Sequence, residues 1–94
     1  MKTVVVTRHA GLVEYLLDIG VITDGEFELH SHATPEVVEG KDVIGVLPHS
    51  LSCLTTSFTE VPMRIPAELR GEELTLEHMR QYASEPVTYF IARK

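Results

Sequence analysis

The chain has a single cysteine, Cys53, no tryptophan, and only eight lysine and arginine residues against fourteen aspartate and glutamate residues. One cysteine excludes a disulfide framework and a four-cysteine zinc site within one chain. The net charge of -6 argues against a broad contact with duplex nucleic acid, which depends on many basic side chains. A small anionic ligand is still compatible with this composition, because a helix N-terminus and one or two arginines can supply a local positive field.

Long apolar runs are also missing. No stretch approaches the roughly 20 apolar residues that span a bilayer, so we expect no membrane partner. The opening sequence MKTVVVTRHAG turns polar too early for the apolar core of a signal peptide, which predicts a cytoplasmic protein. The 94 residues predict one domain over 1–94, and a domain this small gains from pairing into a dimer.

Apolar residues recur at strand spacing and helix spacing in turn along the chain. Val4, Val5 and Val6 form a β-branched run typical of a parallel strand covered on both faces, and residues 12–19 follow at helical spacing. The next segments predict a half-exposed strand over 26–30, a short turn begun by Thr34 and Pro35, and a buried strand over 42–48. About two helical turns over 49–56 follow, and then a strand over 59–66 with Val61, Met63 and Ile65 inward. The chain ends with a predicted helix over 75–83, capped by Thr75, and a strand over 87–92. This order predicts an α/β fold with an open, mostly parallel sheet and right-handed crossovers.

Two strand ends carry the chemistry that the sequence makes visible. Open α/β sheets bind ligands at the carboxyl ends of their strands, and the two most buried strands end in VTRHAG and VLPHSL. Each end places a hydroxyl group and a histidine where a helix begins, namely Thr7 with His9 and Ser50 with His49. Free N–H groups there favour a phosphate, and Arg8 adds a planar set of donors suited to phosphate oxygens. A plainer alternative stays open, in which Thr7 caps the helix, Arg8 pairs with an acid such as Glu14, and His9 is solvated.

Other polar groups give weaker signals. His30 and His32 flank Ser31, but no third ligand stands at a recognisable spacing, so we expect a pair of strand-end histidines and no metal. Cys53 lies among leucines and is expected to be a small core residue.

Three segments together resemble a known family over nearly the whole chain, in the same order. They are MKTVVVTRHAGLVEYLLDIG, HATPEVVEGKDVIGVLPHSL and TEVPMRIPAELRGEELTLEHMRQYA. They resemble a small accessory family encoded beside type III CRISPR systems, called Csx-sixteen. The resemblance implies a stand-alone Rossmann-like domain, similar to the CARF domains that sense cyclic oligoadenylates, and a ring nuclease that cleaves cyclic tetra-adenylate to switch off the signal.

The resemblance also implies the residues and the reaction. It implies catalytic roles for Arg8, His9 and His49, and ligand contacts by Thr7, Ala10, Gly11, Pro48 and Ser50. The implied mechanism is in-line attack by the ribose 2′-hydroxyl, with no metal and no cofactor. A homodimer with two-fold symmetry would match the symmetry of the ring.

Three other functions compete with cleavage. The same pocket would suit a module that binds or sequesters cyclic oligoadenylate without cutting it. A nuclease for ordinary RNA or DNA is disfavoured by the acidic surface. A plain α/β interaction domain would bind no nucleotide ring.

Overall fold

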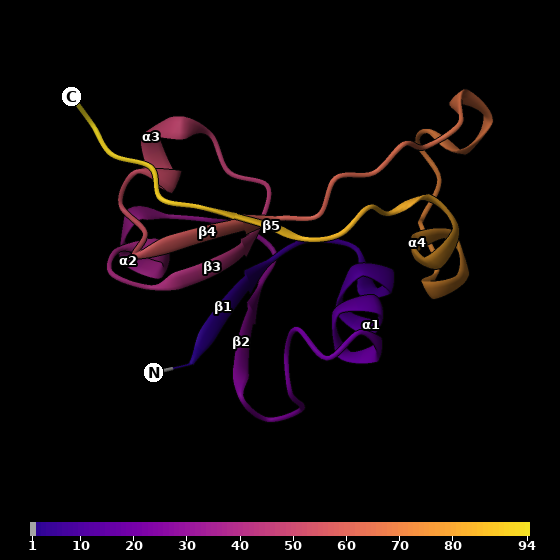
Figure 1. Ribbon diagram of the computed structural model, residues 1–94, viewed down its shortest axis with the longest axis horizontal. Helices are drawn as coiled ribbons and strands as arrows, with labels where there is room; N and C mark the ends of the chain where they lie inside the picture. The colour runs from indigo at the N-terminus through magenta and orange to yellow at the C-terminus, as the bar shows by residue number, and fades with distance from the viewer. Residues whose placement is uncertain (1) are drawn as a thin grey trace.

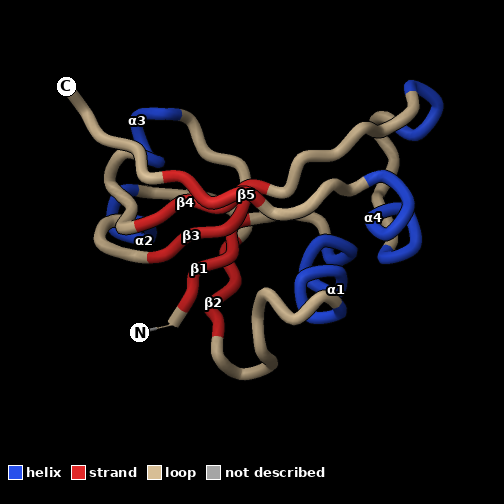
Figure 2. The backbone as a smooth tube through the Cα atoms, in the orientation of Figure 1, coloured by secondary structure: helices blue, strands red, loops and turns tan. Residues whose placement is uncertain are grey.

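Five short strands form one sheet in the computed structural model, which describes residues 2–94 (Figures 1 and 2). The strands lie in the order β2-β1-β3-β4-β5. Their bounds are β1 Thr3–Val6, β2 Phe27–His30, β3 Asp42–Gly45, β4 Ser57–Glu60 and β5 Val87–Tyr89. The first four strands are parallel, and β5 pairs antiparallel with β4. The predicted open, mostly parallel α/β sheet is confirmed, and the architecture is Rossmann-like.

Helices cover both faces of this sheet (Figure 1). Helix α1 (Ala10–Asp18) and helix α4 (Leu76–Tyr82) lie on one face, while the single-turn helices α2 (Pro35–Val38) and α3 (His49–Ser52) lie on the other. A short 3-10 helix, η1 (Ala67–Leu69), precedes α4. Within residues 2–94, no helix is long and apolar enough to cross a membrane.

The valine run of β1 is buried because both faces of the strand are covered. Val5 packs with Ile44 of β3 into the core beneath α1 and α4, where Leu16 and Met79 are fully buried. Val4 and Val6 point to the opposite core, together with Val43 of β3, Val38 of α2 and the partly buried Leu51 of α3. A central parallel strand therefore needs apolar residues at successive positions, as the sequence pattern predicted.

The prediction of a strand over 59–66 is wrong in its position. Strand β4 spans Ser57–Glu60 and ends before Pro62, whose missing N–H cannot continue a ladder. The alternating Val61, Met63 and Ile65 do pack against the core beneath α1 and α4, but in extended chain with one isolated bridge, Met63 to Ala83. The predicted two helical turns over 49–56 are also too long, because α3 ends at Ser52.

The direction of the connections changes beside β1. The chain leaves β1 through α1 to reach β2, and then leaves β2 through α2 on the opposite face to reach β3 on the other side of β1. Such a switch point leaves a crevice between the carboxyl ends of the two diverging strands, here β1 and β3. Gly45 ends β3 with a φ of 151°, and a Cβ at this position would overlap the carbonyl oxygen of Val6. The close approach of β1 and β3 at the crevice thus requires glycine.

Candidate functional site

The loop after β1 borders the crevice. The Thr7 N–H donates to the carbonyl of His30 at 3.0 Å, which continues the β1–β2 pairing by one residue. The His9 N–H donates to Thr7 Oγ1 at 3.1 Å, and His9 occupies the N-cap position of α1. Within residues 2–94 no side chain caps α1, and its first turn contains no acidic residue. The positive end of the helix is therefore not offset by a side chain of its own first turn.

Arg8 pairs with a histidine rather than with an acid. Its Nη2 lies 3.2 Å from Nδ1 of His32, and both side chains are exposed. Among the ion pairs of residues 2–94 none involves Arg8, so the alternative in which Arg8 pairs with Glu14 or another acid does not hold. The plainer alternative is therefore wrong for Arg8, and also for Thr7, whose hydroxyl accepts from His9 and does not cap the helix.

Two adjoining pockets share Arg8 and His9. We call the first the strand-end pocket: it has a volume of about 260 Å³ and lies at the carboxyl ends of the parallel strands. Its apolar wall comes from Val6, Leu12, Val46 and Met63, and its polar rim from Thr7, Arg8, His9 and Ser31. An apolar wall beside a cationic rim and a helix N-terminus suits a ligand with a flat ring and a phosphate.

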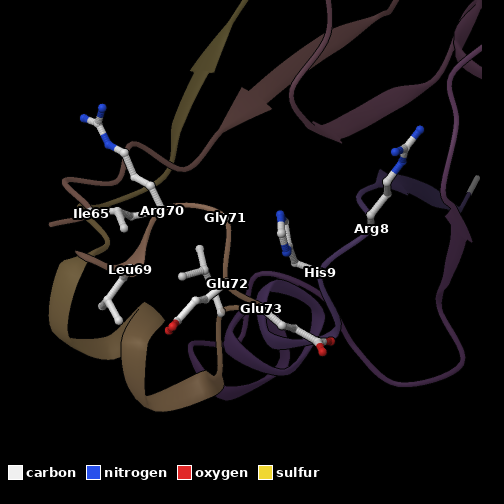
Figure 3. Close-up of a pocket in the computed structure, with 9 residues that line it drawn as sticks. Arg8, His9, Ile65, Leu69, Arg70, Gly71, Glu72 and Glu73 are labelled. Atoms are coloured by element: carbon white, nitrogen blue, oxygen red, sulfur yellow. The ribbon is translucent and has the colours of Figure 1, made fainter. Parts of the chain in front are cut away.

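The second, which we call the loop pocket, has a volume of about 660 Å³. It lies between the start of α1 and the segment 65–74 that precedes α4. In Figure 3 the His9 ring stands between Arg8 on one side and the Arg70–Gly71 loop on the other, and the two arginine side chains extend away from each other. Glu72 and Glu73 add carboxylates to the lining.

The loop after β3 faces a different pocket. Pro48 is the N-cap residue of α3, and His49 is its first residue. His49 and Ser50 line a pocket of about 450 Å³, the α3 pocket, together with Cys53 and residues 91–93. The structure therefore does not bring His49 and Ser50 into either pocket that holds Arg8 and His9.

Ala10 and Gly11 lie where α1 touches the chain before α4. They line a pocket of about 470 Å³ with Glu14 and residues 73–76. Gly11 is buried, and a Cβ there would overlap the carbonyl oxygen of Leu74. Its small size is thus required by packing, and its predicted contact with a ligand stays a prediction.

The remaining polar candidates have ordinary partners. His30 Nε2 lies 3.8 Å from Glu28 Oε1, while His32 contacts Arg8. Within residues 2–94, no group of three or more His, Cys, Asp or Glu side chains is arranged to hold a metal ion. Cys53 is half-buried, and its thiol lies 3.5 Å from the carbonyl of Ser50.

Sequence reasoning missed the residues that reach the site from distant segments. Arg70 lies in a segment that the sequence presents as an ordinary loop, and it borders the loop pocket because α4, which follows this segment, packs on α1. An arginine directly before a glycine with φ of 87° is the one local signal for an exposed cation in a sharp turn. His32 and Val46 have no such signal, because their place depends on the order of the strands.

Comparison with known protein families identifies a match over nearly the whole chain. A family model described as "Putative CRISPR-associated protein (Cas_VVA1548)" matches residues 4–92, which include both strand-end loops. No curated protein matches the chain. No solved structure matches it either.

Proposed function

The chain belongs to this CRISPR-associated family, and from that premise we propose that it is a ring nuclease that binds and cleaves cyclic tetra-adenylate, as the resemblance to Csx-sixteen implies. Cleavage of this ring would switch off type III CRISPR signalling. The observation that carries the proposal is the strand-end pocket, where an apolar wall, the N-terminus of α1 and Arg8, which forms no ion pair with any residue of 2–94, meet at the switch point. Adenine would pack against the apolar wall, and a phosphate of the ring would bind at the cationic rim.

The reaction needs only a positioned phosphodiester. The ribose O2′ attacks the adjacent phosphorus, a P–O2′ bond forms and the P–O5′ bond breaks, which leaves a 2′,3′-cyclic phosphate and a 5′-hydroxyl. The 2′-hydroxyl loses a proton and O5′ gains one. In-line placement alone contributes several orders of magnitude to such a rate. Two cuts would convert the tetra-adenylate ring into linear di-adenylates.

Arg8 and His9 have distinct roles in this proposal. The Arg8 guanidinium and the first N–H groups of α1 would stabilise the negative charge that develops on the non-bridging oxygens of the phosphate under attack. His9 lies at the start of α1 beside these donors and would transfer the proton, because an imidazole can serve as a general acid or a general base. Thr7 fixes the loop by accepting from the His9 N–H.

The role of the β3 loop depends on how far the ring extends. A ring of four nucleotides is larger than the strand-end pocket, and a homodimer would present each loop twice around its two-fold axis. Pro48, His49 and Ser50 would then contact a part of the ring remote from Arg8. We assign His49 and Ser50, which line the α3 pocket, to ligand binding there, and Pro48 to a ligand contact beside it at the start of α3, with His49 as the alternative group for proton transfer.

The first test is incubation of the protein with cyclic tetra-adenylate in excess EDTA, followed by chromatography and mass spectrometry. Linear di-adenylate with a cyclic phosphate supports the proposal. An intact ring that co-elutes with the protein supports the sequestering module instead. An intact ring with no binding refutes both functions.

Two matched pairs of variants then locate the reaction. Arg8→Ala and His9→Gln alter the strand-end pocket, while Arg93→Ala and His49→Gln make the same changes in the α3 pocket. We expect Arg8→Ala to lower turnover about 100-fold, the typical cost of one donor to a developing anion. The α3-pocket pair should chiefly raise KM. Loss of turnover confined to the α3-pocket pair would refute the assignment of the reaction to Arg8 and His9.

A further inference from the structure

Resting on the proposed function, we propose that His32 is a positioning residue that holds the Arg8 guanidinium at the crevice without neutralising its charge. The basis is the contact between Arg8 Nη2 and His32 Nδ1 at 3.2 Å. A guanidinium can only donate hydrogen bonds, so Nδ1 must accept. The His32 ring is therefore neutral in this contact and carries its proton on Nε2.

The backbone brings these two residues together although 24 positions separate them. Strand β2 ends at His30, whose carbonyl accepts from the Thr7 N–H and so aligns the segments that follow both strands. Ser31 and His32 follow directly after β2, and Arg8 follows Thr7 after β1. Ser31 lines the strand-end pocket together with Arg8, so the contact lies at the rim of the candidate site.

The choice of a histidine as partner has a chemical consequence. An acidic chain offers many carboxylates, yet within residues 2–94 Arg8 forms no ion pair. A carboxylate partner would cancel the positive charge and compete with phosphate oxygens for the same donors. A neutral imidazole takes one of the five N–H donors and leaves the charge and the other four for a phosphate. Held in this way, Arg8 also loses less side-chain freedom when the ligand binds.

Three substitutions of His32 separate charge from hydrogen bonding. His32→Asn keeps an acceptor near the position of Nδ1 without a charge, His32→Asp places a charged acceptor of the same size there, and His32→Ala removes the acceptor. We expect kcat/KM for cyclic tetra-adenylate to fall about tenfold in His32→Ala, the equivalent of one ordinary hydrogen bond. His32→Asn should restore kcat/KM to nearly the wild-type value, and His32→Asp should be at least as impaired as His32→Ala.

The same substitutions in an Arg8→Ala background provide the control. If His32 acts through Arg8, its variants have no further effect once Arg8 is absent. Effects that persist in that background overturn the proposal, as does a His32→Ala variant with wild-type kcat/KM. A His32→Asp variant that performs as well as His32→Asn overturns the argument from charge.

A measurement on the free protein separates this inference from the proposed function. The ¹⁵N chemical shifts of the His32 ring, recorded at mildly alkaline pH, should show an unprotonated Nδ1 and a protonated Nε2. Arg8→Ala should alter this tautomer balance. If the wild-type protein neither binds nor cuts the ring, the proposed function fails, whereas the difference in the His32 ring shifts between the wild-type protein and Arg8→Ala still decides whether His32 holds Arg8. A proton on Nδ1 in the wild-type protein overturns the inference.

Discussion

The glycine at the mouth of the crevice allows a direct test of how closely β1 and β3 approach. Gly45 has a φ of 151°, and a Cβ there would meet the backbone carbonyl of Val6, which cannot move without breaking the strand pairing. The substitution Gly45→Ala therefore has two costs. A residue held in a sparsely populated backbone region costs about 1–3 kcal/mol, and overpacking costs about as much again. The expected loss in the free energy of unfolding is about 2–6 kcal/mol.

Two further glycines separate these costs. Gly25 has a φ of 81° but open space around the missing Cβ, so Gly25→Ala has the conformational cost alone, about 1–2 kcal/mol. Gly11 has a helical backbone, but a Cβ there would overlap the Leu74 carbonyl, so Gly11→Ala has the overlap alone. Alanine is favoured over glycine in a helix by about 1 kcal/mol, which offsets part of that cost. Gly25→Ala and Gly11→Ala are therefore both expected to be more stable than Gly45→Ala, which combines the two costs.

Urea unfolding measures these differences through the transition midpoint at constant m value. In a domain of this size each kcal/mol also lowers Tm by roughly 4–8 °C, so Gly45→Ala should lose about 10 °C or more. If Gly45→Ala is no less stable than Gly25→Ala, the two strands do not approach as closely as the overlap requires. The shape of the strand-end pocket would then need revision, because Val6 and Val46 form part of its wall.

Two further features predict measurable effects on stability. Thr75 caps α4 by accepting from the His78 N–H at 3.2 Å, so Thr75→Ala should cost about 0.5–2 kcal/mol in urea unfolding, while Thr75→Ser, which keeps the hydroxyl, should cost little. On α1 and α4, the Arg80 guanidinium donates to both carboxylate oxygens of Asp18 and lowers the pKa of Asp18 from its ordinary 3.8. The pair thus stabilises the fold at pH values above 3.8, and this contribution is lost as the pH falls through the lowered pKa of Asp18. Asp18→Asn should therefore flatten the acid side of the plot of unfolding free energy against pH. The pair is exposed, so the effect should be small and should fade in 1 M salt; an unchanged difference there would contradict an electrostatic origin.

Local patterns predicted the elements whose residues carry their own signal. The run Val4 to Val6 indicates a strand covered on both faces, and Thr75 before a helical pattern indicates the start of α4. The alternation of Val61, Met63 and Ile65 correctly predicts which side chains face inward. It does not predict a strand, because a strand also needs a neighbour with which to pair, and after Pro62 only an isolated bridge forms.

The candidate site was predictable only where it lies next to a strand in the sequence. Arg8 and His9 follow β1 directly, so any sheet with β1 at its centre places them at the carboxyl edge. Arg70 and His32 reach the same region through the packing of α4 on α1 and through the pairing of β2 with β1. Those are contacts between distant segments, and neither spacing nor composition encodes them locally.

The topology also explains why two similar loops lie in different pockets. β1 and β3 are neighbours and end at the same edge of the sheet, yet the helices that follow them pack on opposite faces. The divergence that opens the crevice beside Arg8 and His9 therefore carries His49 and Ser50 away from it. His9 and His49 of one chain therefore cannot both contact a small ligand in a single pocket. Under the proposed function, a cyclic tetra-adenylate that extends across the edge of the sheet would reach both pockets, and a raised KM in the His49→Gln variant would report that extension.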